Sequence, residues 1–108
     1  MRAGRLRHRL QIQMPVEARD DLGGFRQVWM SGGDVWADVE PLKGREGFEA
    51  QSLEARLSHR ITLRGLTELD PRWRLVWLEK DRAFQLFSIR DVGERHRTIE
   101  CLAWEILD

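Results

Sequence analysis

The sequence predicts an all-β protein: a small antiparallel β-barrel or sandwich of about six to seven strands, with one long loop and one short helix. Two observations predict this class. Apolar and polar residues alternate with period two in most segments, and turn residues recur about every 8–12 positions through the second half of the chain. A chain of 108 residues has the length of one ordinary domain, so we expect residues 1–108 to form a single β domain.

The first strand is expected over residues 5–14, where apolar and basic residues alternate. Pro15 should end this strand, because proline has no N–H to donate to a neighbouring strand. A loop over residues 16–24 should follow, since its Asp and Gly residues are typical of turns. The two faces of the strand differ in character: Leu6, Leu10, Ile12 and Met14 form the apolar face, and Arg5, Arg7 and Arg9 form the basic one.

Residues 25–30 and 35–40 are expected to form the next two strands. The second of these places Val35, Ala37 and Val39 on one face. The four residues between the two segments, Ser-Gly-Gly-Asp at 31–34, have the composition of a turn. The two strands should therefore pair as a hairpin with a short loop.

The period-two pattern is interrupted over residues 43–58. This segment is rich in Glu, Ala, Gln and Leu, which are good helix formers, and it contains no proline. We expect an excursion from the β domain that contains one short helix. An extended excursion with only a helical piece is the alternative, because Gly47 weakens the first turn.

The second half of the chain returns to period two. A strand is expected over residues 60–66, and residues 73–77 and 83–92 should form a hairpin across the polar turn at 79–81. Residues 98–107 are apolar on both faces. A strand with that composition is central in a sheet or forms an interface.

The composition excludes several classes of protein. Basic and acidic residues both number 18, so the net charge is zero and binding to nucleic acid through overall positive charge is not expected. No uncharged apolar run approaches the length of a membrane span, so we expect no membrane partner. The single cysteine, Cys101, excludes an internal disulfide, and its apolar neighbours predict a buried thiol without chemistry.

No catalytic residue, metal site or cofactor site is predicted. His8, His59 and His96 are too far apart for a local metal motif, and we expect each to be a solvated surface residue. The glycine pairs lack the residues that complete a phosphate-binding loop. The serines stand in no nucleophile motif. The chain is therefore not expected to be an enzyme.

Two biases in composition indicate an interaction protein. Arg outnumbers Lys 16 to 2, and five Trp occur without any Tyr. Arg and Trp are enriched at protein interfaces, although a GC-rich coding sequence explains the Arg excess equally well. The basic face of the first strand would suit an acidic protein surface or phosphate, or would only discourage aggregation of an edge strand. The candidate interface aromatics are Trp29, Trp36, Trp73 and Trp77.

Several segments occur in the order found in a known family. Residues 1–13 read MRAGRLRHRLQIQ, and the acidic pair and glycine pair of residues 20–24 come next. Trp29, the run VWADVEPL at 35–42, and then Gly44 and Glu46 follow. The run HRITLR at 59–64 and residues 84–102 complete the series. Over residues 2–104 the chain resembles the phage head–tail joining proteins, also called head-closure or stopper proteins of long-tailed phages.

The resemblance implies a structural role in the neck of a virion, prophage-derived particle or gene-transfer-type particle, made in the cytoplasm of a bacterial host. It implies a homo-oligomeric ring of six or twelve copies that closes the DNA exit channel and docks the tail. The implied partners are a connector or adaptor ring above, a tail terminator or tail tube protein below, and packaged double-stranded DNA. Rings require contacts between two different patches on each subunit.

On this resemblance, the basic face would contact the connector or DNA through Arg5, Arg7 and Arg9. Two long excursions would reach neighbouring subunits or the channel. Their candidate residues are Asp20, Asp21, Gly23 and Gly24 in the first, and Glu46, Phe48 and Glu49 in the second. Two alternatives stay open: another neck or tail-completion protein, and an OB-like barrel that binds single-stranded nucleic acid by stacking bases on Trp and Phe in an Arg-lined groove.

Overall fold

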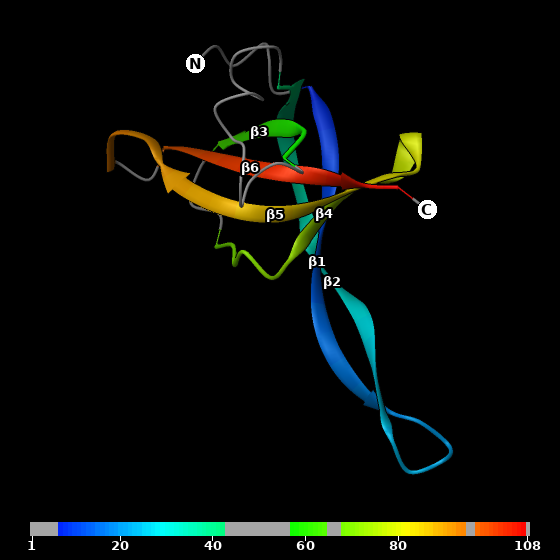
Figure 1. The fold of residues 1–108 in the computed structure, drawn as a ribbon. Coiled ribbons are helices and arrows are strands. Elements are labelled where there is room, and N and C mark those ends of the chain that lie inside the picture. The colour runs from blue at the N-terminus through cyan, green and yellow to red at the C-terminus, as the bar shows by residue number, and fades with distance from the viewer. Residues whose placement is uncertain (1–6, 43–56, 65–67, 95–96, 108) are drawn as a thin grey trace.

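The computed structural model describes residues 7–42, 57–64, 68–94 and 97–107. Six antiparallel strands form one sheet, closed into a barrel in the order β1-β2-β3-β6-β5-β4 (Figure 1). The predicted all-β class is confirmed. The expected helix at 43–58 falls largely on residues 43–56, which lie outside the described residues. The elements are β1 His8–Arg19, β2 Phe25–Pro41, β3 His59–Arg64, β4 Arg74–Trp77, β5 Arg82–Asp91 and β6 Thr98–Ile106, with short 3₁₀ turns η3 Leu78–Lys80 and η4 Val92–Glu94.

The barrel interior is filled by the apolar residues that the period-two pattern assigned to one face of each strand. Every second residue of a strand points inward, so strands β1, β3 and β6 each contribute two or more side chains to one core. The largest fully buried side chain is Phe84 of β5. The other fully enclosed side chains are Leu10, Ile61, Leu63, Leu75, Leu86 and Cys101.

The first two strands extend well beyond the barrel. β1 pairs with β4 only over Gln11–Gln13, and β2 pairs with β3 only over Ala37–Pro41. Residues 14–19 and 25–30 pair with each other alone and, with the turn between them, form a projecting hairpin that we call the arm (Figure 1). The predicted loop over residues 16–24 is therefore wrong, because strand β1 continues to Arg19.

Pro15 does not end the strand because its missing N–H lies on the outer edge of the arm. The backbone N–H of Asp20 donates to the carbonyl of Gly24 at 2.9 Å, so this pair is hydrogen-bonded. Hydrogen-bonded and non-bonded pairs alternate along an antiparallel hairpin. Pro15, opposite Trp29, falls in a non-bonded pair, and its lack of a donor costs the arm no internal hydrogen bond.

The turn of the arm is built by Asp20 and a left-handed glycine. Carboxylate oxygen Oδ1 of Asp20 accepts hydrogen bonds from the backbone N–H groups of Leu22 at 2.9 Å and Gly24 at 2.8 Å. Gly23 has φ +84°, a conformation that side chains disfavour. A three-residue loop that ends in a left-handed glycine is a common hairpin connection. The Asp and Gly residues were thus correctly interpreted as a turn, but within a much tighter hairpin.

The Gly32–Gly33 pair is a bend inside one strand and not a turn between two. The β1–β2 register shifts between Gln11 and Gln13, where two glycines oppose Ile12. A Cβ on Gly32 would approach Ile12 Cγ2 to 3.2 Å, and Gly33 has φ +103°. Bulges of this kind bend strands at barrel rims. The predicted hairpin between residues 25–30 and 35–40 is therefore wrong: they are the two halves of β2.

The remaining strands agree with the sequence prediction except on the outer face of β6. The β4–β5 hairpin is confirmed. In β6 the inward residues Ile99, Cys101 and Ala103 are buried, whereas Leu102 and Trp104 on the other face are only partly buried. The ring of Phe87 lies 6.4 Å from that of Trp104 and covers part of this face. Within the single chain, the outer face of residues 98–107 is therefore less buried than its apolar composition indicated.

The thiol of Cys101, which was predicted to be unreactive, tests whether the barrel core is closed to solvent. Cys101 is 0% exposed, and burial raises its pKa to about 12. Because the thiolate is the reactive form, the native protein should not react with iodoacetamide at neutral pH. Reaction should appear only with global unfolding, at the same denaturant concentration as the fluorescence transition. Labelling of the native protein within minutes would show that the barrel opens far more easily than this packing indicates.

Candidate functional site

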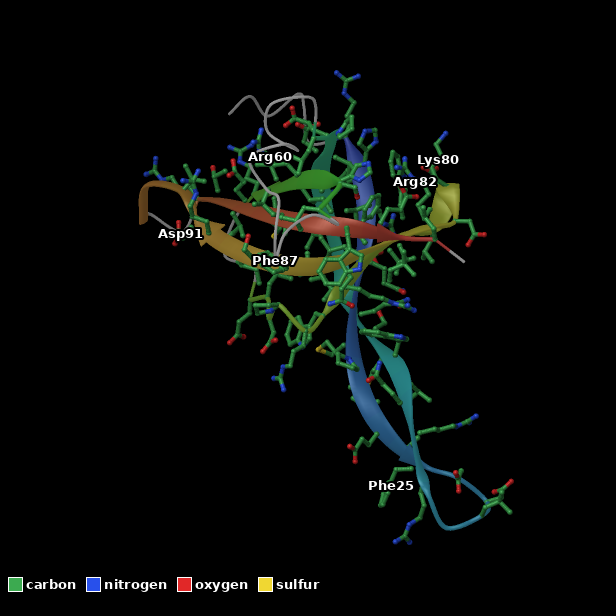
Figure 2. The ribbon with its side chains drawn as sticks, in the orientation of Figure 1. Phe25, Arg60, Lys80, Arg82, Phe87 and Asp91 are labelled. Carbon is green, nitrogen blue, oxygen red and sulfur yellow. The ribbon has the colours of Figure 1, made fainter. Side chains whose placement is uncertain are left out.

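Exposed apolar side chains are concentrated on the arm. Leu22 at its tip is 96% exposed, Phe25 is 64% exposed and Met30 is 51% exposed. Figure 2 shows Phe25 far from the barrel, near the end of the arm. A hairpin of two strands has no core of its own, so these side chains are presented to solvent and are available to a partner.

The predicted loop residues Asp20, Asp21, Gly23 and Gly24 all belong to the tip of the arm. Three of them shape the turn, and Asp21 is exposed. The structure thus brings this predicted set together around Leu22, which the sequence analysis did not select. The other predicted set, Glu46, Phe48 and Glu49, lies outside the described residues.

The four candidate tryptophans have different environments. Trp36 is 58% exposed on the barrel surface. Trp29 is half-buried at the base of the arm, where the guanidinium of Arg74 lies 4.1 Å from its ring centre. Trp73 packs against the core. Trp77 is 7% exposed, so the prediction that it presents its ring to a partner is wrong: its ring packs in the core.

The basic face of β1 borders a groove of about 380 Å³ on the barrel. Arg9 and Trp36 are directly opposite each other on paired strands, and Leu78 of η3 adds an exposed apolar side chain. The Arg9 guanidinium binds the Asp34 carboxylate, with Nη2 and Oδ2 2.8 Å apart. Arg5 lies outside the described residues. The groove is lined by Arg7, Arg9, Leu10, Gln11, Asp34, Trp36, Leu78 and Glu79.

A partly buried polar cluster lies near the start of β3 and the end of β6. Arg82 donates to both carboxylate oxygens of Glu105, at 2.9 and 3.0 Å. Its Nη2 also lies 3.3 Å from His59 Nε2, and His59 Nδ1 lies 2.8 Å from Ser58 Oγ. The Ser58 hydroxyl accepts the backbone N–H of Glu105 at 2.9 Å. The cluster ties three strands together around the barrel end.

The prediction that His59 is a solvated surface residue is wrong. The side chain is 9% exposed and its ring meets that of Phe84 edge-on at 4.9 Å. The sequence pattern does indicate burial of His59, because alternate residues of a strand face the same side and His59 alternates with the core residues Ile61 and Leu63. Because Arg82 can only donate, Nε2 of His59 accepts and the ring is neutral.

Burial lowers the pKa of His59, and the positive charge of Arg82 lowers it further, whereas Glu105 raises it. The hydrogen bonds from Arg82 lower the pKa of Glu105. In both cases the folded state releases protons more readily than the unfolded state. Protonation of either group therefore favours unfolding.

Stability should consequently fall as the pH drops below 6.5, the ordinary pKa of histidine. The unfolded state binds a proton on His59 in that range while the folded state resists it. Urea unfolding between about pH 7.5 and 5.5 would measure this, above the range in which carboxylates titrate. In His59→Gln, whose amide oxygen still accepts from Arg82, the pH dependence should flatten. An unchanged slope in that variant would assign the effect to another group.

No group of three or more His, Cys, Asp or Glu side chains in the described ranges is arranged to hold a metal ion. Within the same residues, no helix has the length and apolar character to cross a membrane.

A family model of the phage head completion protein matches residues 1–106. The chain belongs to the phage head completion protein family. Head completion protein gp7 of Enterobacteria phage HK97 is 30% identical over 89 residues, which cover 82% of this chain and 80% of that protein. This confirms the resemblance to head–tail joining proteins and identifies a structural component of a phage or phage-like particle. Both the family and the relative from phage HK97 are described as head completion proteins.

Two solved structures share the fold over nearly the whole chain. The solution structure of protein SF1141 from Shigella flexneri 2a aligns with a TM-score of 0.76 at 24% identity, covering 97% of this chain and 96% of that one. A chain in the virion of a native gene transfer agent particle aligns with a TM-score of 0.66 at 24% identity, covering 96% and 98%. Both matches show that the fold of this chain is shared with these two proteins, at 24% sequence identity.

Proposed function

We propose that this head completion protein assembles as a ring of six or twelve copies under the connector of a DNA-filled head. The ring closes the DNA exit channel and forms the surface on which the tail docks. The observation that carries the proposal is the arm, since Leu22, Phe25 and Met30 are exposed on a hairpin with no core of its own. Neighbouring proteins would bury these side chains, which the barrel leaves exposed to solvent.

Five of the exposed large apolar side chains lie in two separate patches, and a ring requires two unlike contact patches on each subunit. One patch is the arm tip, and the other is the groove with Trp36 and Leu78. Arg9 and Asp20 are separated by most of β1, so the two patches lie roughly 35 Å apart at the rise of an extended strand. Rotational rings use contacts between unlike patches on successive subunits.

The basic rim of the groove is proposed to face the connector or the packaged DNA. Arg7 and Arg9 are exposed, and Arg9 lies on β1 while Arg7 lies directly before it. The Asp34 carboxylate holds the Arg9 side chain in a fixed position. An oriented guanidinium can bind a carboxylate or a phosphate with two parallel hydrogen bonds.

The alternative of a barrel that binds single-stranded nucleic acid has less support. Stacking of bases needs exposed aromatic faces on a basic surface. Trp77 is buried, and Arg74 lies over the ring of Trp29. The exposed Phe25 is on the arm and Trp36 is on the barrel, so the two rings do not form one platform.

The proposal is tested by adding purified protein to DNA-filled, tailless heads that carry their connector. Saturable co-sedimentation in multiples of six copies per head, with less DNA leakage, is expected. Heads that lack the connector serve as the control and should not bind. Saturable binding without any effect on leakage would contradict the closure role, and no binding at all would contradict the ring.

A further inference from the structure

Within the part of the chain that the structure describes, the arm has two strand edges without a partner. Beyond Gln13, β1 pairs only with β2, and from Phe25 to Met30 β2 pairs only with β1. Unpaired edges are templates for another strand, and a two-stranded hairpin gains stability when a third strand joins it. Both edges of the arm are thus suited to strand addition.

The register shows which backbone groups face outward. The hydrogen bond from Asp20 to Gly24 makes the even-numbered pairs of the arm the internally bonded ones. The N–H and C=O groups of the odd-numbered residues therefore point away from the hairpin. On β1 these residues are Pro15, Glu17 and Arg19, and on β2 they are Phe25, Gln27 and Trp29.

We propose that the outer edge of β2 in one copy pairs antiparallel with the outer edge of β1 in the next copy. This rests on the proposed ring and joins its arms into one continuous sheet. With the arms side by side at the same height, Gln27 lies opposite Glu17 of the next copy, as it lies opposite Glu17 of its own chain. The outward N–H and C=O groups of one edge then lie opposite those of the neighbouring edge, and neither strand has to shift along the other.

The side chains match in the same register. Val28 lies beside Val16 of the next copy, and Met30 beside Met14, so the apolar face of the arm continues across the junction. One hydrogen bond between the two arms is lost, because Pro15 has no backbone N–H to donate to the neighbouring copy.

The turn of the arm and its β2 strand carry opposite charges. Glu17 and Arg19 cancel on the β1 strand, the turn adds Asp20 and Asp21, and the single charge on β2 between Phe25 and Met30 is Arg26. In the proposed register Arg26 is one diagonal step from Asp20 of the next copy. Asp20 uses Oδ1 for its own turn, and its carboxylate keeps its negative charge at the tip of the arm.

A second copy fits better than a strand of another protein, because one repeated contact fills both edges of every arm. A foreign strand would fill one edge and leave the other open. The charged residues and Pro15 on the edge discourage pairing of free chains. Pairing is therefore expected where a connector holds copies together.

Chains that each carry one added cysteine test this arrangement, because the native Cys101 is buried in the core and the added thiol has no accessible partner in its own chain. Chains with Glu17→Cys and chains with Gln27→Cys are mixed, assembled on connector-bearing heads and oxidised with copper phenanthroline, because a disulfide forms only where the two Cα atoms lie within about 7 Å. Cross-linked dimers are expected from the mixture and not from either variant alone. Glu17→Cys mixed with Val28→Cys is the control, since Val28 is on the opposite face. Cys101 is fully buried and should not react.

A second pair of variants tests the backbone. Gln27→Pro removes an outward N–H that the arm does not use internally, whereas Gln27→Ala keeps it. Proline should weaken assembly on heads about tenfold, the effect of losing one hydrogen bond at each junction, and alanine should not.

The outcomes separate the two proposals. Wild-type binding to heads together with the 17–27 cross-link supports the paired arms. Wild-type binding without that cross-link, or with a cross-link to a different neck protein, overturns the paired arms and leaves the ring intact. Failure of the wild-type protein to bind heads overturns both.

Discussion

Replacement of Phe84 by alanine is expected to lower the free energy of unfolding by about 3–5 kcal/mol, the usual range for a large core aromatic. Phe84 is the largest side chain that is fully buried, and its ring also supports that of His59. A loss of this size is a large fraction of the total stability of a small domain. Urea unfolding followed by tryptophan fluorescence would measure it.

Phe87 offers a control of the same residue type on the same strand. Its side chain is 37% exposed on the outside of the barrel, so Phe87→Ala should cost less than about 1 kcal/mol. Phe84→Leu should recover much of the loss, because leucine keeps most of the buried volume. Equal destabilisation by Phe84→Ala and Phe87→Ala would contradict the assignment of inner and outer faces in β5.

The double substitution Leu22→Asp and Phe25→Asp should weaken binding to connector-bearing heads by about a hundredfold or more. The transfer of two large apolar side chains from water into an interface contributes about 3 kcal/mol or more, and this corresponds to more than two orders of magnitude in affinity. Co-sedimentation over a range of protein concentrations would give the midpoint. The thermal transition should hardly change, because both residues are exposed.

Leu107→Asp is the matched control for the arm variant. Leu107 is 83% exposed but follows β6, away from the arm. It should bind heads as the unchanged protein does. If the double arm variant also bound normally, the arm would not be the contact surface and the proposed function would lose its main support.

The inward and outward faces of the strands could be predicted from the sequence because burial follows a period of two. This rule placed Leu10, Ile61 and Cys101 correctly in the core. The same rule gives an inward position for His59. The prediction for His59 was wrong because it rested on the residue type and not on the position of the residue in the strand.

The arm could not be predicted because the usual preferences of proline and glycine do not show whether a residue lies in a hydrogen-bonded or a non-bonded pair between two strands. Pro15 is compatible with a strand when its ring nitrogen lies in a non-bonded pair, and this depends on the register that Asp20 and Gly24 set. Gly32 and Gly33 form a bulge rather than a turn: Ile12 and Met14 lie close to Gly32, and Gly33 has a positive φ. Both features depend on contacts between strands, which local sequence does not contain.

The candidate surface was predicted in part. The turn residues at 20–24 and the exposed Trp36 were selected from the sequence, whereas Leu22 and Leu78 were not. Single exposed leucines have no sequence signature, since apolar residues are common on protein surfaces. Their significance follows from the arm and the groove, which exist only in the folded chain.

Electron cryomicroscopy of connector-bearing heads after addition of the purified protein tests the central claim most directly. The expected result is a ring of barrels directly beneath the connector, with the arms side by side and the channel narrowed below the last turn of DNA. Heads whose connector stays bare at saturating protein, or that carry the protein only elsewhere on the capsid, would contradict it.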